Sequence, residues 1–109
     1  MAARNDARVI CDGEWDISRA EEFARLAAEG LARGTPLLIL DFRQATFVDA
    51  STVGAICAVA REASAKGIQV GVACGEGFVR RVFELVHLAD VVPVAKTPEH
   101  AMRAAAAGA

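Results

Sequence analysis

The chain has 109 residues, with 12 Lys+Arg against 14 Asp+Glu and a formal net charge of −2. This length is typical of one domain, and 54% hydrophobic residues are enough for a packed core, which excludes a wholly disordered chain. The slightly acidic balance and the lack of any Lys/Arg block argue against a nucleic-acid binder. No apolar run reaches the roughly 18–20 residues of a bilayer span, and the first residues do not resemble a secretory signal. We therefore expect a cytoplasmic protein without direct membrane insertion.

The three cysteines, Cys11, Cys57 and Cys74, are odd in number and far apart. Neither a disulfide framework nor a zinc site can be built from this spacing. We expect reduced thiols that act as small buried hydrophobes, and we expect no metal and no cofactor.

Short apolar stretches alternate along the chain with stretches of helical periodicity. The candidate strands are residues 8–11, 37–40, 69–73 and 91–94. The candidate helices begin near residues 20, 51, 78 and 98, residues 41–48 form a connection, and the tail 104–109 is expected to fray. The aliphatic run 37–40 is continuous, which is typical of a strand covered on both faces of a parallel sheet. Together these elements predict one α/β domain, with a core of about residues 8–102 and flexible ends. Its mostly parallel sheet would have four to five strands, flanked by about four helices.

Three helix starts carry capping signals. Ser18 and Glu21 have the spacing of a capping box ahead of the first helix. Ser51 is expected to be the N-cap of the second helix, and Thr97 followed by Pro98 suits the start of the last one. The second helix has a predicted apolar stripe of Val53, Ile56, Ala60 and Ala63.

Functional sites of parallel sheets gather beyond the carboxyl ends of the strands, which here means segments 13–18, 42–52 and 74–78. Within the second segment, residues 47–54 read Phe-Val-Asp-Ala-Ser-Thr-Val-Gly. This octapeptide resembles the signature of the STAS domain, whose usual form is Phe-x-Asp-Ser-Ser-Gly-Leu-Gly. Further segments resemble the family in the same order, namely Gly-Glu-Trp-Asp at 13–16, the third helix and last strand at 79–94, and the closing helix at 97–101.

The resemblance implies a STAS-type (βα) superhelix and a bacterial docking module that is not an enzyme. Antagonists of this family bind an anti-sigma factor, typically a serine-protein kinase of the histidine-kinase-like ATPase fold, and so release a sigma factor. In this partner switch the kinase phosphorylates the first serine after the motif's aspartate, and a phosphatase reverses the mark. The resemblance also implies that this chain has a partner-binding surface, which consists of Glu14, Trp15, Asp16, Asp49, Ala50, Ser51, Thr52 and Gly54.

The chain departs from the family at the phosphorylated position, because Ala50 stands there and has no hydroxyl. Phosphorylation therefore either shifts to Ser51 or Thr52 or does not occur, which would make the chain a non-phosphorylatable pseudo-antagonist. Another alternative is a STAS subunit of a membrane lipid ABC transporter.

Several of these residues also have purely structural readings. In these readings Ser51 serves only as a cap, Asp49 as a carboxylate that satisfies turn amides, and Gly54 as a point of close approach between helix and sheet. Trp15 is expected either to anchor a partner or to cover the core.

An enzyme is the least favoured class for this sequence. The residue two before Ser51 is Asp49 rather than the glycine of a nucleophile elbow. The histidines, His87 and His100, fall in or beside helices rather than in the strand-end loops, so neither is placed as a base for Ser51. We therefore expect no catalytic residues.

Overall fold

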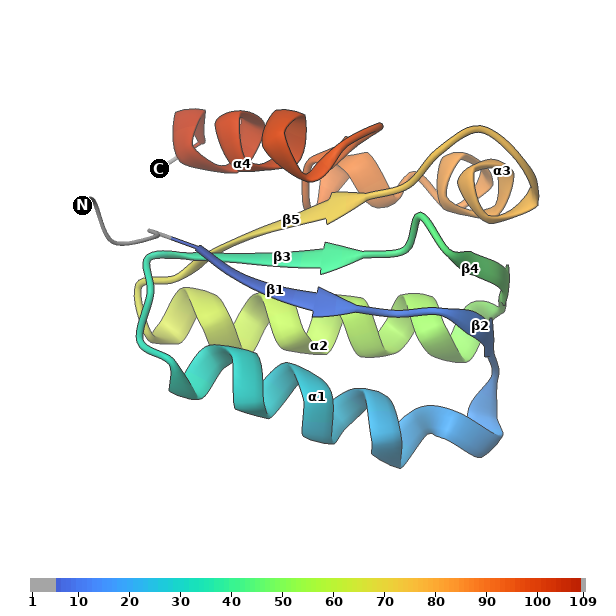
Figure 1. The fold of residues 1–109 in the computed structure, drawn as a ribbon, viewed down its shortest axis with the longest axis horizontal. Helices are drawn as coiled ribbons and strands as arrows, with labels where there is room; N and C mark the ends of the chain where they lie inside the picture. The colour runs from blue at the N-terminus through green and yellow to red at the C-terminus, as the bar shows by residue number, and fades with distance from the viewer. Residues whose placement is uncertain (1–5, 109) are drawn as a thin grey trace.

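The computed structural model describes residues 6–108, which form a parallel sheet with helices on both faces (Figure 1). The strand order is β1-β3-β5-β6, and a separate parallel pair, β2-β4, continues beyond the carboxyl ends of β1 and β3. The strands are β1 (Asp6–Ile10), β2 (Gly13–Trp15), β3 (Leu37–Asp41), β4 (Ala45–Val48), β5 (Gln69–Ala73) and β6 (Val94–Ala95). The predicted α/β class and mostly parallel sheet are confirmed.

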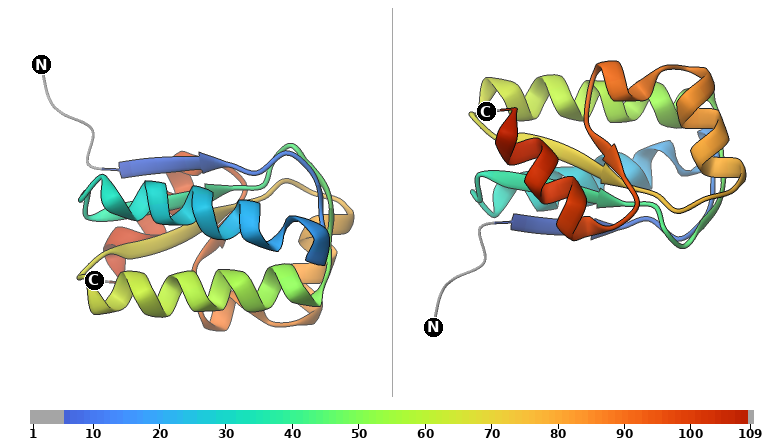
Figure 2. Two further views of the ribbon diagram at one scale, coloured as in Figure 1. Left: turned by 90° about the horizontal axis from the view of Figure 1, so that it is seen from below. Right: turned by 90° about the horizontal axis from the view of Figure 1, so that it is seen from above.

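Two helices cover one face of the sheet and one helix covers the other (Figure 2). The helices are α1 (Ala20–Ala32), α2 (Ala50–Ala65), α3 (Phe78–Leu85) and α4 (Pro98–Ala107), with short 3-10 turns η1 (Ile17–Arg19) and η2 (Leu88–Asp90). Helices α1 and α2 lie on one side, α4 lies on the other, and α3 stands at the end of the sheet beside β4 (Figure 1).

Strand β3 is buried on both sides, as its continuous aliphatic sequence predicts. Leu38 and Leu40 belong to the large core under α1 and α2, whereas Ile39 belongs to a smaller core under α4. All three side chains are 0% exposed. Burial of one such side chain stabilises the fold by about 1.5–3 kcal/mol, so β3 is the centre of both cores.

Two glycines allow helices to approach the sheet. A Cβ on Gly71 of β5 would lie 2.9 Å from the carbonyl oxygen of Ala101 in α4. A Cβ on Gly30 of α1 would lie 2.7 Å from Cδ1 of Leu38. A side chain on Gly71 would push α4 away from the sheet, and one on Gly30 would displace the Leu38 side chain in the core.

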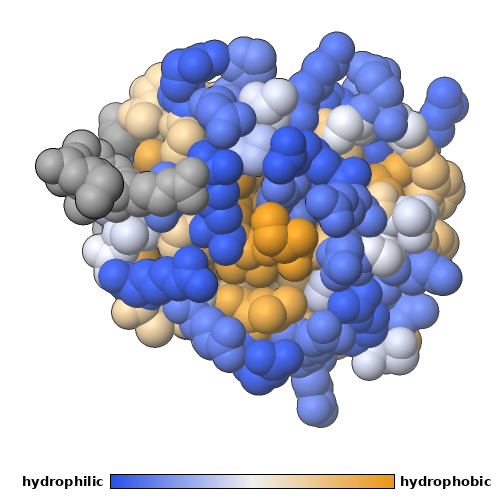
Figure 3. Space-filling model, in the orientation of Figure 1, coloured by the Kyte–Doolittle hydropathy of each residue, from blue (hydrophilic) through white to orange (hydrophobic). Residues whose placement is uncertain are grey.

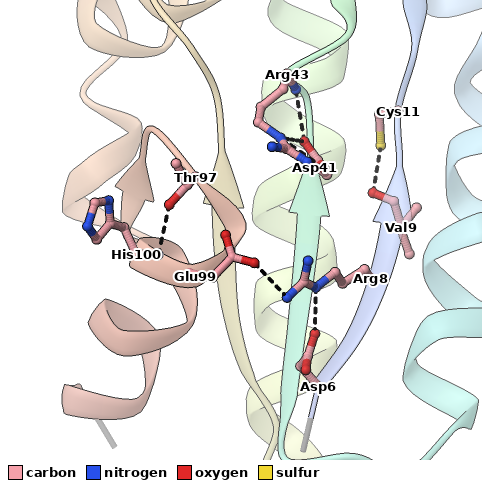
Figure 4. A network of polar contacts seen from close by, with 9 residues as sticks. All are labelled: Asp6, Arg8, Val9, Cys11, Asp41, Arg43, Thr97, Glu99 and His100. Carbon is pink, nitrogen blue, oxygen red and sulfur yellow. Dashed lines mark hydrogen bonds and ion pairs between the residues drawn. The ribbon is translucent and has the colours of Figure 1, made fainter. Parts of the chain in front are cut away.

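Edge strand β1 is tied to α4 by charged side chains (Figure 4). The Arg8 guanidinium donates to the carboxylates of Asp6 on the same strand, at 2.9 Å, and of Glu99 on α4, at 3.2 Å. The face of the molecule that carries β1 shows a small hydrophobic patch within a hydrophilic surround (Figure 3). Ile10, which is 50% exposed, is the exposed large hydrophobic residue of this strand.

The thiols of Cys11 and Cys74 lie in the core, as expected. Burial raises the pKa of Cys11 to about 12 and that of Cys74 to about 11, so both thiols stay protonated at neutral pH. Cys57 is only partly buried, and all three cysteines are free.

Several local predictions are wrong. The 3-10 turn η1, capped by Asp16, precedes α1, so Ser18 and Glu21 form no capping box; the Ser18 hydroxyl donates to Asp16 instead. The expected connection 41–48 contains β4. The expected strand 91–94 is reduced to β6 (Val94–Ala95), because residues 91–93 form an irregular turn after η2. Helix α4 extends into the tail that we expected to fray and buries Ala105. The expected flexible N-terminus falls largely on residues 1–5, which lie outside the described part of the chain.

The stripe predicted for α2 is partly correct. Ile56 and Ala63 are buried, but Thr52 and Val59 complete the buried face, while Val53 and Ala60 remain partly exposed. No helix within residues 6–108 has both the length and the apolar character required to cross a bilayer.

Candidate functional site

The β2-β4 pair brings two acidic loops to the same end of the molecule. Trp15 at the end of β2 pairs with Val48 at the end of β4. Asp16 and Asp49 directly follow these residues, so both carboxylates lie beyond the carboxyl ends of the strands, where the sequence predicts the site.

Asp49, not Ser51, caps helix α2. Its backbone is extended (φ −132°, ψ −173°), and its Oδ1 accepts from the backbone N–H groups of Ser51 at 3.0 Å and Thr52 at 3.2 Å. The backbone N–H of Asp49 reaches Thr52 Oγ1 at 3.5 Å, which completes a capping box. The hydrogen bond from the Ser51 hydroxyl, together with these N–H groups, lowers the pKa of Asp49. Asp49 is therefore ionised at neutral pH and holds the first turn of α2.

Three consecutive residues at the start of α2 differ in their side-chain exposure to solvent. Ala50 is exposed and has only a methyl group. Ser51 is partly exposed, and its Oγ donates to Asp49 Oδ1 at 2.6 Å. Thr52 is 5% exposed, and its Oγ1 donates to the Trp15 carbonyl oxygen at 2.6 Å. Successive helix positions rotate by about 100°, so a hydroxyl at one position faces solvent while the next is turned into the core.

Trp15 covers the core instead of projecting from the loop. Its side chain is 1% exposed and meets Phe23 edge to face, with 5.9 Å between the ring centroids. Its indole Nε1 is buried without a hydrogen-bond partner among the described residues. Of the two interpretations of Trp15 from the sequence, burial supports the core-covering one.

Arg19 ties the β2 segment to the start of α1, a role that the sequence did not predict. Its guanidinium lies 3.6 Å from the centroid of the Trp15 ring and pairs with Glu22 through two bonds of 2.9 Å. Nη1 also donates to the carbonyl oxygens of Asp12, at 2.9 Å, and Glu14, at 3.0 Å. This arrangement fixes the loop while the Glu14 side chain stays exposed and the Asp16 carboxylate accepts from the N–H of Ser18.

Gly54 lies on the outward face of α2 and has no packing role. A Cβ at this position would meet no atom within 4 Å. The interpretation of Gly54 as a point of close approach to the sheet is therefore wrong; Gly30 and Gly71 have that role. Ala58, one turn further along α2, is also exposed, so this face of the helix is smooth and open.

An aromatic pair adjoins the site. Phe47, two residues before Asp49, stacks on Phe78 at the start of α3, with ring centroids 5.6 Å apart and ring planes 14° apart. Phe78 remains 54% exposed. The sequence placed both residues in strand-end segments, but only the fold shows that they touch.

At the start of α2 the arrangement offers one partly exposed hydroxyl, that of Ser51, which is bonded to the carboxylate of Asp49. Within residues 6–108 no group of three or more His, Cys, Asp and Glu side chains is placed to hold a metal ion. The free surface of the site consists of Glu14, Asp16, Asp49, Ala50, Ser51 and Gly54.

Comparison with known proteins gives the family and the fold. The family profile of the STAS domain matches residues 4–101. The chain is similar to an anti-sigma factor antagonist from Mycobacterium paratuberculosis, with a TM-score of 0.84 and 20% identity over 97% of this chain and 90% of that one. It is also similar to SpoIIAA, a Bacillus cell fate determinant solved in its phosphorylated form, with a TM-score of 0.64 and 24% identity over 94% and 93% of the two chains. The STAS domain of a SulP transporter from Vibrio cholerae matches with a TM-score of 0.61 and 21% identity over 99% and 86%. No curated relative matches the sequence significantly.

Proposed function

Because the chain belongs to the STAS domain family, we propose that it acts as an anti-sigma factor antagonist, which binds an anti-sigma factor and so releases a sigma factor. Solved antagonists that share its fold over nearly the whole chain support this role. The observation that supports the proposal is the accessible surface around Asp49, where Ser51 stays partly exposed and Gly54 is exposed among the residues that the structure describes. The proposal places the protein in the cytoplasm, where sigma factors act.

The proposed activity is binding, not catalysis. A partner that covers the start of α2 must remove water from Asp49 and Asp16 and supply compensating donors. A phosphate at this position would add about −1.5 to −2 charges and three acceptor oxygens beside these two carboxylates. That added charge would weaken the complex by about 100-fold or more, since each factor of ten needs only ~1.4 kcal/mol.

Ser51 is the proposed phosphate acceptor. Ala50 has no oxygen, and the Thr52 hydroxyl is turned inward to the Trp15 carbonyl. Ser51 is the hydroxyl of this turn that is accessible without unwinding the helix. A kinase would have to displace one hydrogen bond, the one from Ser51 Oγ to Asp49. The partner is then an anti-sigma factor with serine-protein kinase activity, and a phosphatase would restore binding.

The experiment that tests the proposal has two steps. The immobilised chain is first used to isolate its partner from the source cells, and the purified partner is then incubated with the chain and ATP. We expect a partner of the ATPase fold and an intact mass increased by one phosphate. The Ser51→Ala variant should lose this increase, and the matched Thr52→Val variant should keep it.

Other outcomes have distinct meanings. Phosphate on Thr52 would contradict the acceptor assignment. If wild type binds the kinase but only the Ala50→Ser variant is phosphorylated, the chain is a pseudo-antagonist that its partner cannot switch off. Loss of all binding to an ATPase-fold protein would refute the antagonist role itself.

The second candidate is a STAS subunit of a membrane transporter, for example one that carries lipids. The structural likeness to a SulP transporter domain favours it. Copurification distinguishes the two functions. The transporter alternative predicts that membrane transporter subunits copurify with the chain, whereas the antagonist role predicts that a soluble kinase does.

A further inference from the structure

Arg19 and Ser51 line the same small hollow in the surface. Helices α1 and α2 begin at the same end of the molecule (Figure 1). The hollow between their first turns has a volume of about 10 Å³, the room of roughly one water molecule, and its lining includes Asp16, Arg19, Ser51 and Thr52. Because the hollow is this narrow, a phosphate on Ser51 has ion-pair reach to the Arg19 guanidinium.

The Arg19 guanidinium keeps one N–H group for a further acceptor. A guanidinium has five N–H groups in a planar fork. In Arg19, Nε and Nη2 each donate to Glu22 at 2.9 Å, and Nη1 donates to the carbonyl oxygens of Asp12 and Glu14. Within residues 6–108 the second N–H of Nη2 has no acceptor, and the side chain is 28% exposed. Arg19 can therefore bind a new anion without releasing the β2 segment.

Phosphorylation removes the contact that holds the Ser51 side chain in place. The Ser51 hydroxyl donates to Asp49 Oδ1 at 2.6 Å. A phosphoserine has no hydrogen on Oγ, so this bond is lost, and the Asp49 carboxylate repels the phosphate. The backbone N–H groups of Ser51 and Thr52 are already occupied by Asp49. The phosphate must therefore turn to another staggered rotamer, and Arg19 is a cation that lines the hollow beside it.

The other charges around Ser51 are carboxylates. Asp16 lines the hollow, Asp49 caps α2, and Glu22 is the present partner of Arg19. A phosphate dianion carries more charge than the Glu22 carboxylate, and its oxygens match the guanidinium fork, so it competes with Glu22 for Arg19. The carboxylates raise the pKa of a phosphate beside them, whereas the guanidinium lowers it.

We propose that Arg19 is the intramolecular receptor of a phosphate on Ser51 and forms an ion pair that joins the starts of α1 and α2. This inference rests on the proposed function, in which Ser51 is the phosphate acceptor. The ion pair covers the turn that the partner contacts, so phosphorylation masks this turn in addition to making it more negative. Arg19 is a positioning residue, because it takes no part in the transfer and fixes where the phosphate lies.

The test uses the full chain with genetically encoded phosphoserine at position 51, so that no kinase is needed. Phosphorus NMR follows the second pKa of the phosphate, which is ordinarily about 6. Arg19→Gln should raise this pKa by about one unit, because the nearby cation is lost. Arg25→Gln is the matched control and should change the phosphate pKa little, since Arg25 is an α1 arginine that is 60% exposed and pairs with Glu29.

Glu22→Gln is a second variant that keeps the guanidinium in place. It removes the competing carboxylate, so it should lower the phosphate pKa further, whereas the matched Glu29→Gln variant should not. Melts followed by circular dichroism show whether each variant is folded. If Arg19→Gln does not fold, the pair of Glu22→Gln and Glu29→Gln decides the question.

The outcomes separate the ion pair from the proposed function. Equal phosphate pKa values in wild type, folded Arg19→Gln and Glu22→Gln would overturn the role of Arg19 and leave the antagonist function standing. An equal rise in Arg19→Gln and Arg25→Gln would also overturn it, because net charge alone would then explain the pKa. If the pKa responds to Arg19 but phosphoserine leaves the affinity for the isolated anti-sigma factor unchanged, the ion pair stands and the proposed switch fails.

Discussion

Replacing Gly54 with alanine should stabilise the chain. Gly54 lies in the interior of α2, where glycine costs about 0.8–1.0 kcal/mol relative to alanine because its backbone loses more freedom on folding. A Cβ there meets no atom within 4 Å, so no steric cost offsets this gain. With about 2.1 cal/mol/K of unfolding entropy per residue, the gain corresponds to a melting temperature about 4 °C higher.

Ala58→Gly is the matched control, because Ala58 lies one turn further along the same exposed face of α2. It should lower the melting temperature by a similar amount, about 4 °C. Calorimetric melts of the two variants and wild type measure both effects. A destabilised Gly54→Ala variant would refute the assignment of Gly54 to open surface.

The same substitution should weaken binding of the anti-sigma factor. If the partner approaches the start of α2 closely, the added methyl group occupies space that the partner needs. Stability and affinity should therefore change in opposite directions in Gly54→Ala. Unchanged affinity in the more stable variant would show that the partner does not contact this turn of α2.

The remaining predictions concern the contacts that support the site. Thr52→Val should lower the free energy of unfolding by about 1–2 kcal/mol in urea titrations, because it leaves the Trp15 carbonyl unpaired; Thr52→Ser should change it little. Burial alone would raise the pKa of Asp41, but its bonds to Arg43 outweigh this and lower it. The stability from that pair is present above the ordinary pKa of about 3.9 and is lost as the pH falls through the pKa of the folded state. Asp41→Asn should therefore flatten the acid limb of a curve of unfolding free energy against pH. An unchanged acid limb would show that the pair of Asp41 and Arg43 does not stabilise the fold. Gly71→Ala should destabilise the chain by about 1–3 kcal/mol, because the new Cβ meets a carbonyl of α4 at 2.9 Å, and a neutral effect would mean that α4 shifts freely.

The sheet and the helices were predictable because their hydrophobic patterns are long and uniform. The run Leu37–Leu40 indicates a strand buried on both faces, and the structure confirms it. Strands β2 and β4 were missed because each has only three or four residues with mixed exposure, and such segments have no usable periodicity. They form only because the connections after β1 and β3 run side by side, which is a consequence of the tertiary fold.

The site was predictable in position but not in orientation. The motif identifies residues 47–54, yet Asp49 and Ser51 are equally suitable N-caps by residue type. The extended backbone of Asp49 decides between them, and the placement of the Ser51 and Thr52 hydroxyls follows from that choice. The stacking of Arg19 on Trp15 depends on how η1 turns the chain, which no local pattern encodes.

The packing of the fold leaves several features near the site unexplained. Gly54 weakens α2 without any steric need, and Leu85 and Phe78 expose apolar surface that the buried side chains of α3 do not require. These features belong to different elements, and each is unfavourable for the isolated chain. The contact between Phe47 and Phe78 connects them to the Asp49 turn. Natural chains tolerate such costs mainly where function demands them, and the proposed docking surface at the start of α2 would account for the cost of Gly54.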